Sequence, residues 1–165
     1  MSTLWSYFWP AFSLGLLCGV VAGIFAWRRE RRRLLLGAGL IAAVALAILW
    51  HGPFGGAARF SAKVERGVHS TLVYYEMTQV TAHLQHDPLT RQVLLAGPAD
   101  DFQRSELVRL MGQIPGVSSA SWSSASRGVP LILQGVAAAL VGFLLGLLLA
   151  YLVELRRRYN AQWNW

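Results

Sequence analysis

Three stretches without a charged side chain set the first limit on what this chain can fold into. They are residues 4–27, 34–50 and 129–153, and Gln134 is the only strongly polar residue in the third. A helix needs about 20 predominantly apolar residues to cross a bilayer, with about 17 as the lower limit. The sequence therefore predicts three transmembrane helices. For the second and shortest stretch, a re-entrant or buried helix is the alternative interpretation.

Arginines beside these stretches account for nearly all of the net charge of +7. Because cytoplasmic loops of membrane proteins are rich in Arg and Lys, residues 28–33 and the C-terminal tail are predicted to be cytoplasmic. The N-terminus and residues 51–128, whose charges nearly balance, are then outside the cytoplasm. The pattern indicates topology signals and lipid headgroup contacts rather than nucleic-acid binding. The residues assigned to this role are Arg28, Arg29, Arg31, Arg32, Arg33, Arg156, Arg157 and Arg158.

Small residues recur every four positions in the first and third stretches. Residues four apart share a helix face, and close backbone approach at such faces drives helix association in lipid. Two interpretations stay open: the stripes pack the three helices together, or they bind a helix of another subunit. The predicted helix-packing residues are Ala11, Gly15, Gly19 and Gly23 in the first stretch, and Ala138, Gly142, Gly146 and Ala150 in the third.

The interiors of the three stretches contain no Asp, Glu, Lys, Arg or His. Ion pathways, proton relays and haem ligation generally use such residues within the membrane. We therefore do not expect the chain to act alone as a pump, a transporter or a tetrapyrrole-binding protein.

The segment between the second and third stretches has the periodicity of a water-soluble domain. Phe60, Val64, Val68 and Leu72 predict a helix over about 58–75. Alternation of apolar and polar residues predicts strands at 79–85, 91–97 and 117–123. A second helix is expected to begin at Asp100, which forms a capping-box pair with Gln103, and to end at Pro115 and Gly116. The predicted domain boundaries are 1–56, 57–127 and 128–165.

The order helix, strand, strand, helix, strand (α-β-β-α-β) resembles the BON domain, a small module of bacterial envelope proteins. The likeness covers roughly residues 59–122 and is best at "VLLAGPADDFQRSELVRLMGQIPGV". There a strand ending in Gly97, a helix and "PGV" follow the family pattern, although Arg91 and Gln92 stand where a glycine is common. The motif residues are Gly97, Asp100, Pro115, Gly116 and Val117. The resemblance implies a periplasmic domain that contacts phospholipid or protein and performs no catalysis.

Residue clusters that carry chemistry are few. His83, His86 and Asp87 are close in sequence, but their placement on a strand and a turn does not predict convergence on a metal ion. The serine-rich run after Val117 lacks the glycines of a nucleophile elbow. We expect no catalytic residues, no metal site and no cofactor.

These observations lead to an expected fold class and function. The fold class is a membrane α-helical protein with three transmembrane helices and a small α+β periplasmic domain. The expected function is that of a non-enzymatic scaffold or accessory subunit in the inner membrane of a Gram-negative bacterium. Its expected partners are other membrane subunits, bound through the transmembrane helices, and phospholipids, but not nucleic acid. The alternative is a phospholipid-binding protein of envelope maintenance or stress.

Overall fold

The computed structural model describes residues 3–28, 31–122 and 128–162 and divides the chain into two units. The α+β unit comprises Met1–Tyr7 and Gly55–Gln134, and the helical unit comprises Phe8–Phe54 and Gly135–Trp165. Three helices are long and apolar enough to cross a membrane, and one small three-stranded sheet accompanies them. The chain is thus mostly helical, in keeping with a membrane protein.

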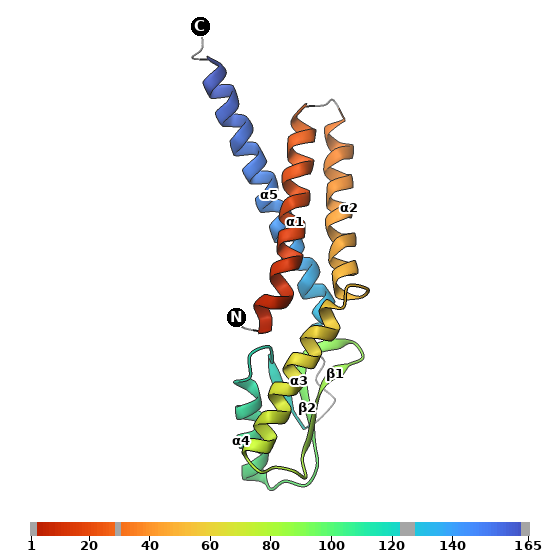
Figure 1. Ribbon diagram of the computed structural model, residues 1–165, viewed down its shortest axis with the longest axis vertical. Helices are drawn as coiled ribbons and strands as arrows, with labels where there is room; N and C mark the ends of the chain where they lie inside the picture. The colour runs from red at the N-terminus through yellow and green to blue at the C-terminus, as the bar shows by residue number, and fades with distance from the viewer. Residues whose placement is uncertain (1–2, 29–30, 123–127, 163–165) are drawn as a thin grey trace. The chain divides into compact units, whose positions relative to one another are not determined.

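The three long helices are α1 (Thr3–Arg28), α2 (Arg32–His51) and α5 (Leu131–Gln162). Figure 1 shows them drawn in red, orange and blue. At a rise of 1.5 Å per residue, the 32 residues of α5 extend over roughly 48 Å. This length exceeds the roughly 30 Å of a bilayer's hydrocarbon core, so α5 continues well past the predicted span that ends at residue 153.

The helical unit has its core where the three long helices meet. Ala22 of α1, Ala43 of α2 and Phe143 of α5 are buried together, and Cys18 and Leu147 pack against them. Two alanines and one large aromatic ring fill this space, so the helix backbones approach closely. Cys18, the one cysteine of the sequence, lies half-buried beside this cluster.

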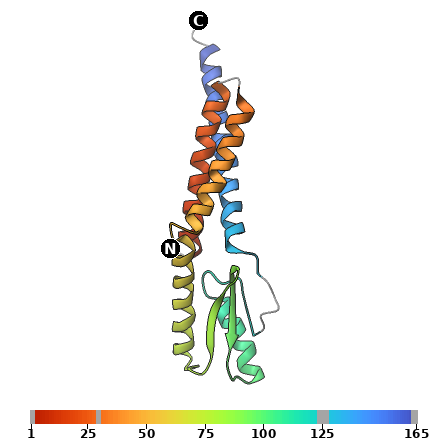
Figure 2. The same ribbon diagram turned by 90° about the vertical axis from the view of Figure 1, so that its right-hand side faces the viewer.

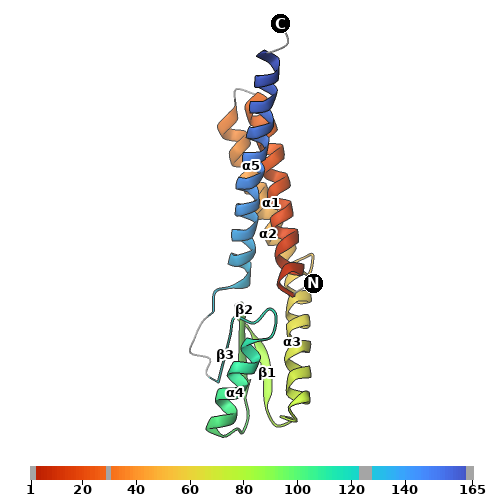
Figure 3. The ribbon, with the colours of Figure 1, turned by 90° about the vertical axis from the view of Figure 1, so that its left-hand side faces the viewer.

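The α+β unit contains α3 (Gly56–Tyr74), β1 (Thr81–His86), β2 (Leu89–Ala96), α4 (Asp101–Gly112) and β3 (Ser119–Ser121). The sheet order is β1-β2-β3, with β1 and β2 antiparallel and β2 and β3 parallel. α3 packs against β1, and α4 packs against β3 (Figures 2 and 3). The parallel pair requires a crossover, which α4 provides.

Local sequence signals account for both helices of this unit. The four apolar residues predicted for α3, Phe60, Val64, Val68 and Leu72, are all buried. At the start of α4, Asp100 Oδ1 accepts a hydrogen bond of 2.7 Å from the Gln103 backbone, and Gln103 Oε1 accepts one of 3.1 Å from the Asp100 backbone. The predicted capping box is therefore confirmed.

The core of the α+β unit joins the sheet to the two shorter helices. Leu84, Val93 and Leu95 are buried on β1 and β2, and Leu107 and Met111 are buried on α4. The start of α1 also contributes to this core, because the ring of Tyr7 lies 5.7 Å from that of Phe60 on α3. The unit therefore extends beyond the predicted segment 57–127.

Candidate interaction surfaces

The closest helix contact in the helical unit joins α1 to α5 through glycines. A methyl group added at Gly15 would overlap the carbonyl oxygen of Ala139, and one added at Gly19 would overlap that of Phe143. Gly142 and Gly146 approach the carbonyl oxygens of Phe12 and Leu16 in the same way. Contact positions increase together along both helices, so α1 and α5 run parallel. The two small-residue stripes therefore face each other within one chain.

The predicted stripe residues lie in this contact, except that Ala139 takes the place predicted for Ala138. Ala11 and Ala150 are buried, and a Cβ at Gly23 would lie 2.5 Å from Cβ of Ala150. Ala138 is only half-buried, whereas its neighbour Ala139 is fully buried. Residues spaced by four move gradually around a helix that has 3.6 residues per turn. A step of three back from Gly142 reaches Ala139, which therefore lies nearer the contact face than Ala138. Periodicity alone does not show where that step occurs.

Of the three long helices α2 is the least buried, and it carries an apolar seam. Only 11% of the residues in its most apolar stretch are buried, against 28% in α1 and α5. Its buried residues, Ala43 and Ala47, lie on one face. Leu34, Gly37, Ile41, Val44 and Ile48 recur at alternating steps of three and four residues on another face, and we call them the α2 seam. A Cβ added at Gly37 would meet nothing within 4 Å, so this seam has an open notch.

The arginine clusters lie at the ends of the long helices. Arg31, Arg32 and Arg33 are exposed at the start of α2, and Arg156, Arg157 and Arg158 are exposed on α5. Glu154 pairs with Arg158 at 3.1 Å and with Arg157 at 4.0 Å. Arg28 ends α1, but its side chain, like all of Arg29, falls outside the described residues.

The residues of the predicted domain motif occupy the turns on either side of α4. Gly97 has φ +132°, and a Cβ there would lie 2.5 Å from the carbonyl oxygen of Gln79. Gly116 has φ +115°, and a Cβ there would lie 2.7 Å from Cγ2 of Val64. Pro115 is exposed and Val117 is buried, while Asp100 caps α4. Both glycines thus combine a backbone conformation that favours glycine with a close approach.

A polar cluster in the central strand has a role that the sequence did not reveal. Thr90 and Gln92 are almost fully buried on β2, and Gln92 donates a hydrogen bond of 2.8 Å to Ser121. Arg91 is the residue between Thr90 and Gln92 in the strand. It donates from Nε to the carbonyl oxygen of Gly116 at 2.9 Å and from Nη1 to Oε1 of Gln134 at 3.3 Å. Burial lowers the pKa of Arg91. The only sequence signal was the run of polar residues in an otherwise apolar strand.

Replacing Arg91 by methionine is expected to destabilise the α+β unit by about 1–3 kcal/mol, because the buried carbonyl oxygen of Gly116 loses its donor. The change is measured by thermal unfolding of the full chain in detergent, with hydrogen exchange of the β2 amides as the readout. Arg66→Met is the control, since Arg66 is exposed and donates to the Ala62 carbonyl oxygen of its own helix. Equal stability of both variants would contradict the structural role of Arg91.

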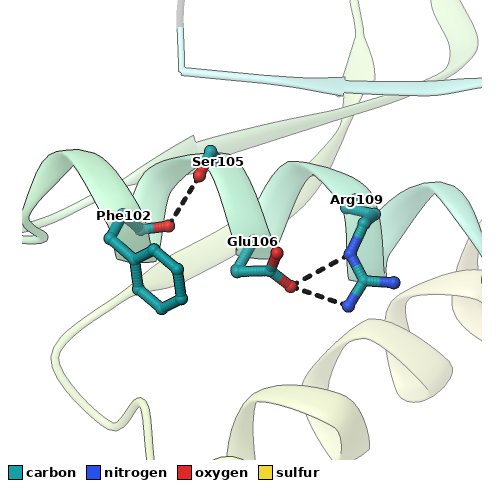
Figure 4. Close-up of polar contacts among 4 residues, drawn as sticks. All are labelled: Phe102, Ser105, Glu106 and Arg109. Carbon is teal, nitrogen blue, oxygen red and sulfur yellow. Dashed lines mark hydrogen bonds and ion pairs between the residues drawn. The ribbon is translucent and has the colours of Figure 1, made fainter.

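The α+β unit exposes aromatic side chains on α4 and at the end of α3. Figure 4 shows Phe102, Glu106 and Arg109 along α4, and the Phe102 side chain is 74% exposed. Arg109 donates from Nε and Nη2 to Glu106 Oε2 at 3.0 and 2.7 Å, and this pairing raises the pKa of Arg109. Tyr74, at the end of α3, is 79% exposed. Exposed aromatic and arginine side chains are typical of protein contact sites.

The histidines do not form a cluster with one another. His86 Nε2 lies 3.6 Å from Glu65, and His86 Nδ1 lies 2.8 Å from the Leu84 carbonyl oxygen, while His83 is exposed on β1. Within the described ranges, no group of three His, Cys, Asp or Glu side chains has metal-ligand geometry.

The fold and these surfaces define a class of protein: a chain with three potential membrane-spanning helices and a small α+β unit. A scan against protein-family models, a search of curated proteins and a search of solved structures gave no match. The resemblance to the BON domain therefore stays a prediction from the sequence.

Proposed function

We propose that the chain crosses a bacterial inner membrane three times and serves as a non-enzymatic accessory subunit of a larger membrane complex. In this proposal the N-terminus and the α+β unit are periplasmic, and residues 28–33 and the end of α5 are cytoplasmic. The uneven distribution of arginines supports this topology. The parallel contact of α1 with α5 is compatible with it, because both helices then cross in the same direction.

The α2 seam is the observation that carries this proposal. The glycine stripes of α1 and α5 pack against each other, so they do not provide the partner-binding surface. The α2 seam has coiled-coil spacing, and the notch at Gly37 allows another helix to approach. On the α+β unit, the exposed Phe102 and Tyr74 side chains are two further candidate contact points, consistent with a BON-like interaction domain.

Replacing Gly37 by leucine is expected to release the partner, because the side chain fills the notch that a second helix would enter. Purification of the full chain in mild detergent with mass spectrometry should recover a stoichiometric membrane protein with the wild type. We expect at least tenfold less of that protein with the Gly37→Leu variant, which corresponds to about 1.4 kcal/mol of lost binding energy. The variant should retain its own stability, because among the described residues nothing beyond Gly37's own chain neighbours lies within 4 Å of the added Cβ.

Ala137→Leu is the matched control, since Ala137 is exposed on α5 and lies outside the α2 seam. It should leave recovery of the partner unchanged. A wild-type chain purified alone, with no stoichiometric membrane protein, would contradict the accessory-subunit role. Equal losses with Gly37→Leu and Ala137→Leu would show that the α2 seam is not the contact.

A further inference from the structure

An apolar groove lies between α1 and α2 on the side of α2 away from its seam. Val21 and Phe25 of α1 and Leu35, Ala38 and Ala42 of α2 are among the residues that line it. It arises because small residues on α2 face larger side chains on α1. Its volume is about 360 Å³. An apolar lining of this kind suits a hydrocarbon chain.

Positive charge lies at the end of this groove. The helices are joined at Arg28–Arg32, so Phe25 and Leu35 are nearest that end. Arg31 precedes Leu35 by one turn and accepts its backbone N–H at 3.2 Å. The guanidinium of Arg32 lies 5.7 Å from the ring centroid of Trp27, which in turn lies 5.7 Å from that of Tyr151. The helix ends near the groove thus carry the arginines and aromatic rings typical of a membrane interface, although neither Trp27 nor Tyr151 lines the groove.

The two arginine clusters of the helical unit differ in charge balance. Glu154 pairs with two of the three arginines on α5. Residues 28–33, by contrast, hold five arginines against the single carboxylate of Glu30. The groove end therefore complements an anion more strongly than the α5 cluster does, and arginine forms bidentate hydrogen bonds with phosphate.

We propose that this groove binds one anionic phospholipid, with an acyl chain between α1 and α2 and the phosphate at Arg31 and Arg32. The apolar lining fits the chain, and the arginines select the negatively charged headgroup over a zwitterionic one. This inference rests on the proposed membrane insertion, but it does not depend on a partner subunit. The Gly37→Leu variant, which tests the partner, leaves the groove unchanged.

Native mass spectrometry of the full chain, equilibrated with equal amounts of phosphatidylglycerol and phosphatidylcholine, tests this proposal. We expect one phosphatidylglycerol to be retained per chain. Arg31→Gln should lower its retention about fivefold, since one basic residue near a membrane surface contributes about a factor of five. Ala38→Phe should also lower retention at least fivefold, because the ring fills the groove. Circular dichroism confirms that each variant is folded.

Matched controls separate charge and volume from general disturbance. Arg156→Gln removes an arginine from the other cluster, and Ile41→Phe adds an aromatic ring on the α2 seam. Both should retain phosphatidylglycerol like the wild type. Three results would overturn the proposal: equal retention of the two lipids, equal loss with Ala38→Phe and Ile41→Phe, or loss with Phe102→Ser but not with Ala38→Phe. The last result would place the lipid at the α+β unit.

Discussion

Replacing Gly19 by alanine is expected to destabilise the helical unit by about 1–3 kcal/mol. The added methyl group would overlap the carbonyl oxygen of Phe143, which is backbone and can move only if α1 and α5 separate. Close packing is the main force between helices in lipid, so their separation also weakens contacts at Gly15, Gly142 and Gly146. Titration with SDS in mixed micelles, followed by tryptophan fluorescence, measures this loss as a lower midpoint.

Gly37→Ala is the matched control for this prediction. It makes the same change in a neighbouring helix, but at a position where the added Cβ meets nothing within 4 Å. Its midpoint should stay the same or rise slightly, because alanine favours a helix over glycine by up to about 1 kcal/mol. Equal midpoints for Gly19→Ala and Gly37→Ala would mean that α1 and α5 are not in backbone contact.

Replacing Gly97 by alanine should destabilise the α+β unit by about 2–4 kcal/mol, through two independent effects. The φ angle of +132° is one that side chains with a Cβ rarely adopt. The new Cβ would also lie 2.5 Å from the carbonyl oxygen of Gln79, so the chain before β1 would have to move away from β2. Hydrogen exchange of the β1 and β2 amides in the full chain should show reduced protection.

Gly112→Ala is the control within the same unit. Gly112 is the last residue of α4, and a Cβ there would meet nothing within 4 Å. Protection of the β1 and β2 amides should therefore stay at the wild-type level. Wild-type protection in Gly97→Ala as well would show that Gly97 is not held in this conformation.

The elements that could be predicted from the sequence are those with strong local signals. The apolar stretches became α1, α2 and α5, and the four-residue spacing of Phe60, Val64, Val68 and Leu72 became the buried face of α3. The capping box at Asp100 depends on residues three apart, so it too can be recognised locally. Strand boundaries were less accurate: β3 covers Ser119–Ser121 of the expected segment 117–123, whose last residue lies outside the described residues.

The residues that escaped prediction depend on contacts between distant parts of the chain. Arg91 bonds to Gly116 and Gln134, which are 25 and 43 residues away. Tyr7 packs on Phe60 from the start of α1, which the sequence assigned wholly to the membrane. Neither pairing leaves a periodic pattern, since a single contact between remote segments needs only one suitable residue on each side.

The sequence by itself determined the class of this protein: three helices able to cross a membrane, a small α+β unit and arginines at the helix ends. These properties follow from local hydropathy, periodicity and capping. Only the tertiary structure decided that the stripes of α1 and α5 face each other, that Ala139 rather than Ala138 is fully buried, and that α2 exposes a seam and borders a groove. Periodicity places residues on a common helix face, but the partner of that face depends on how all three helices pack together.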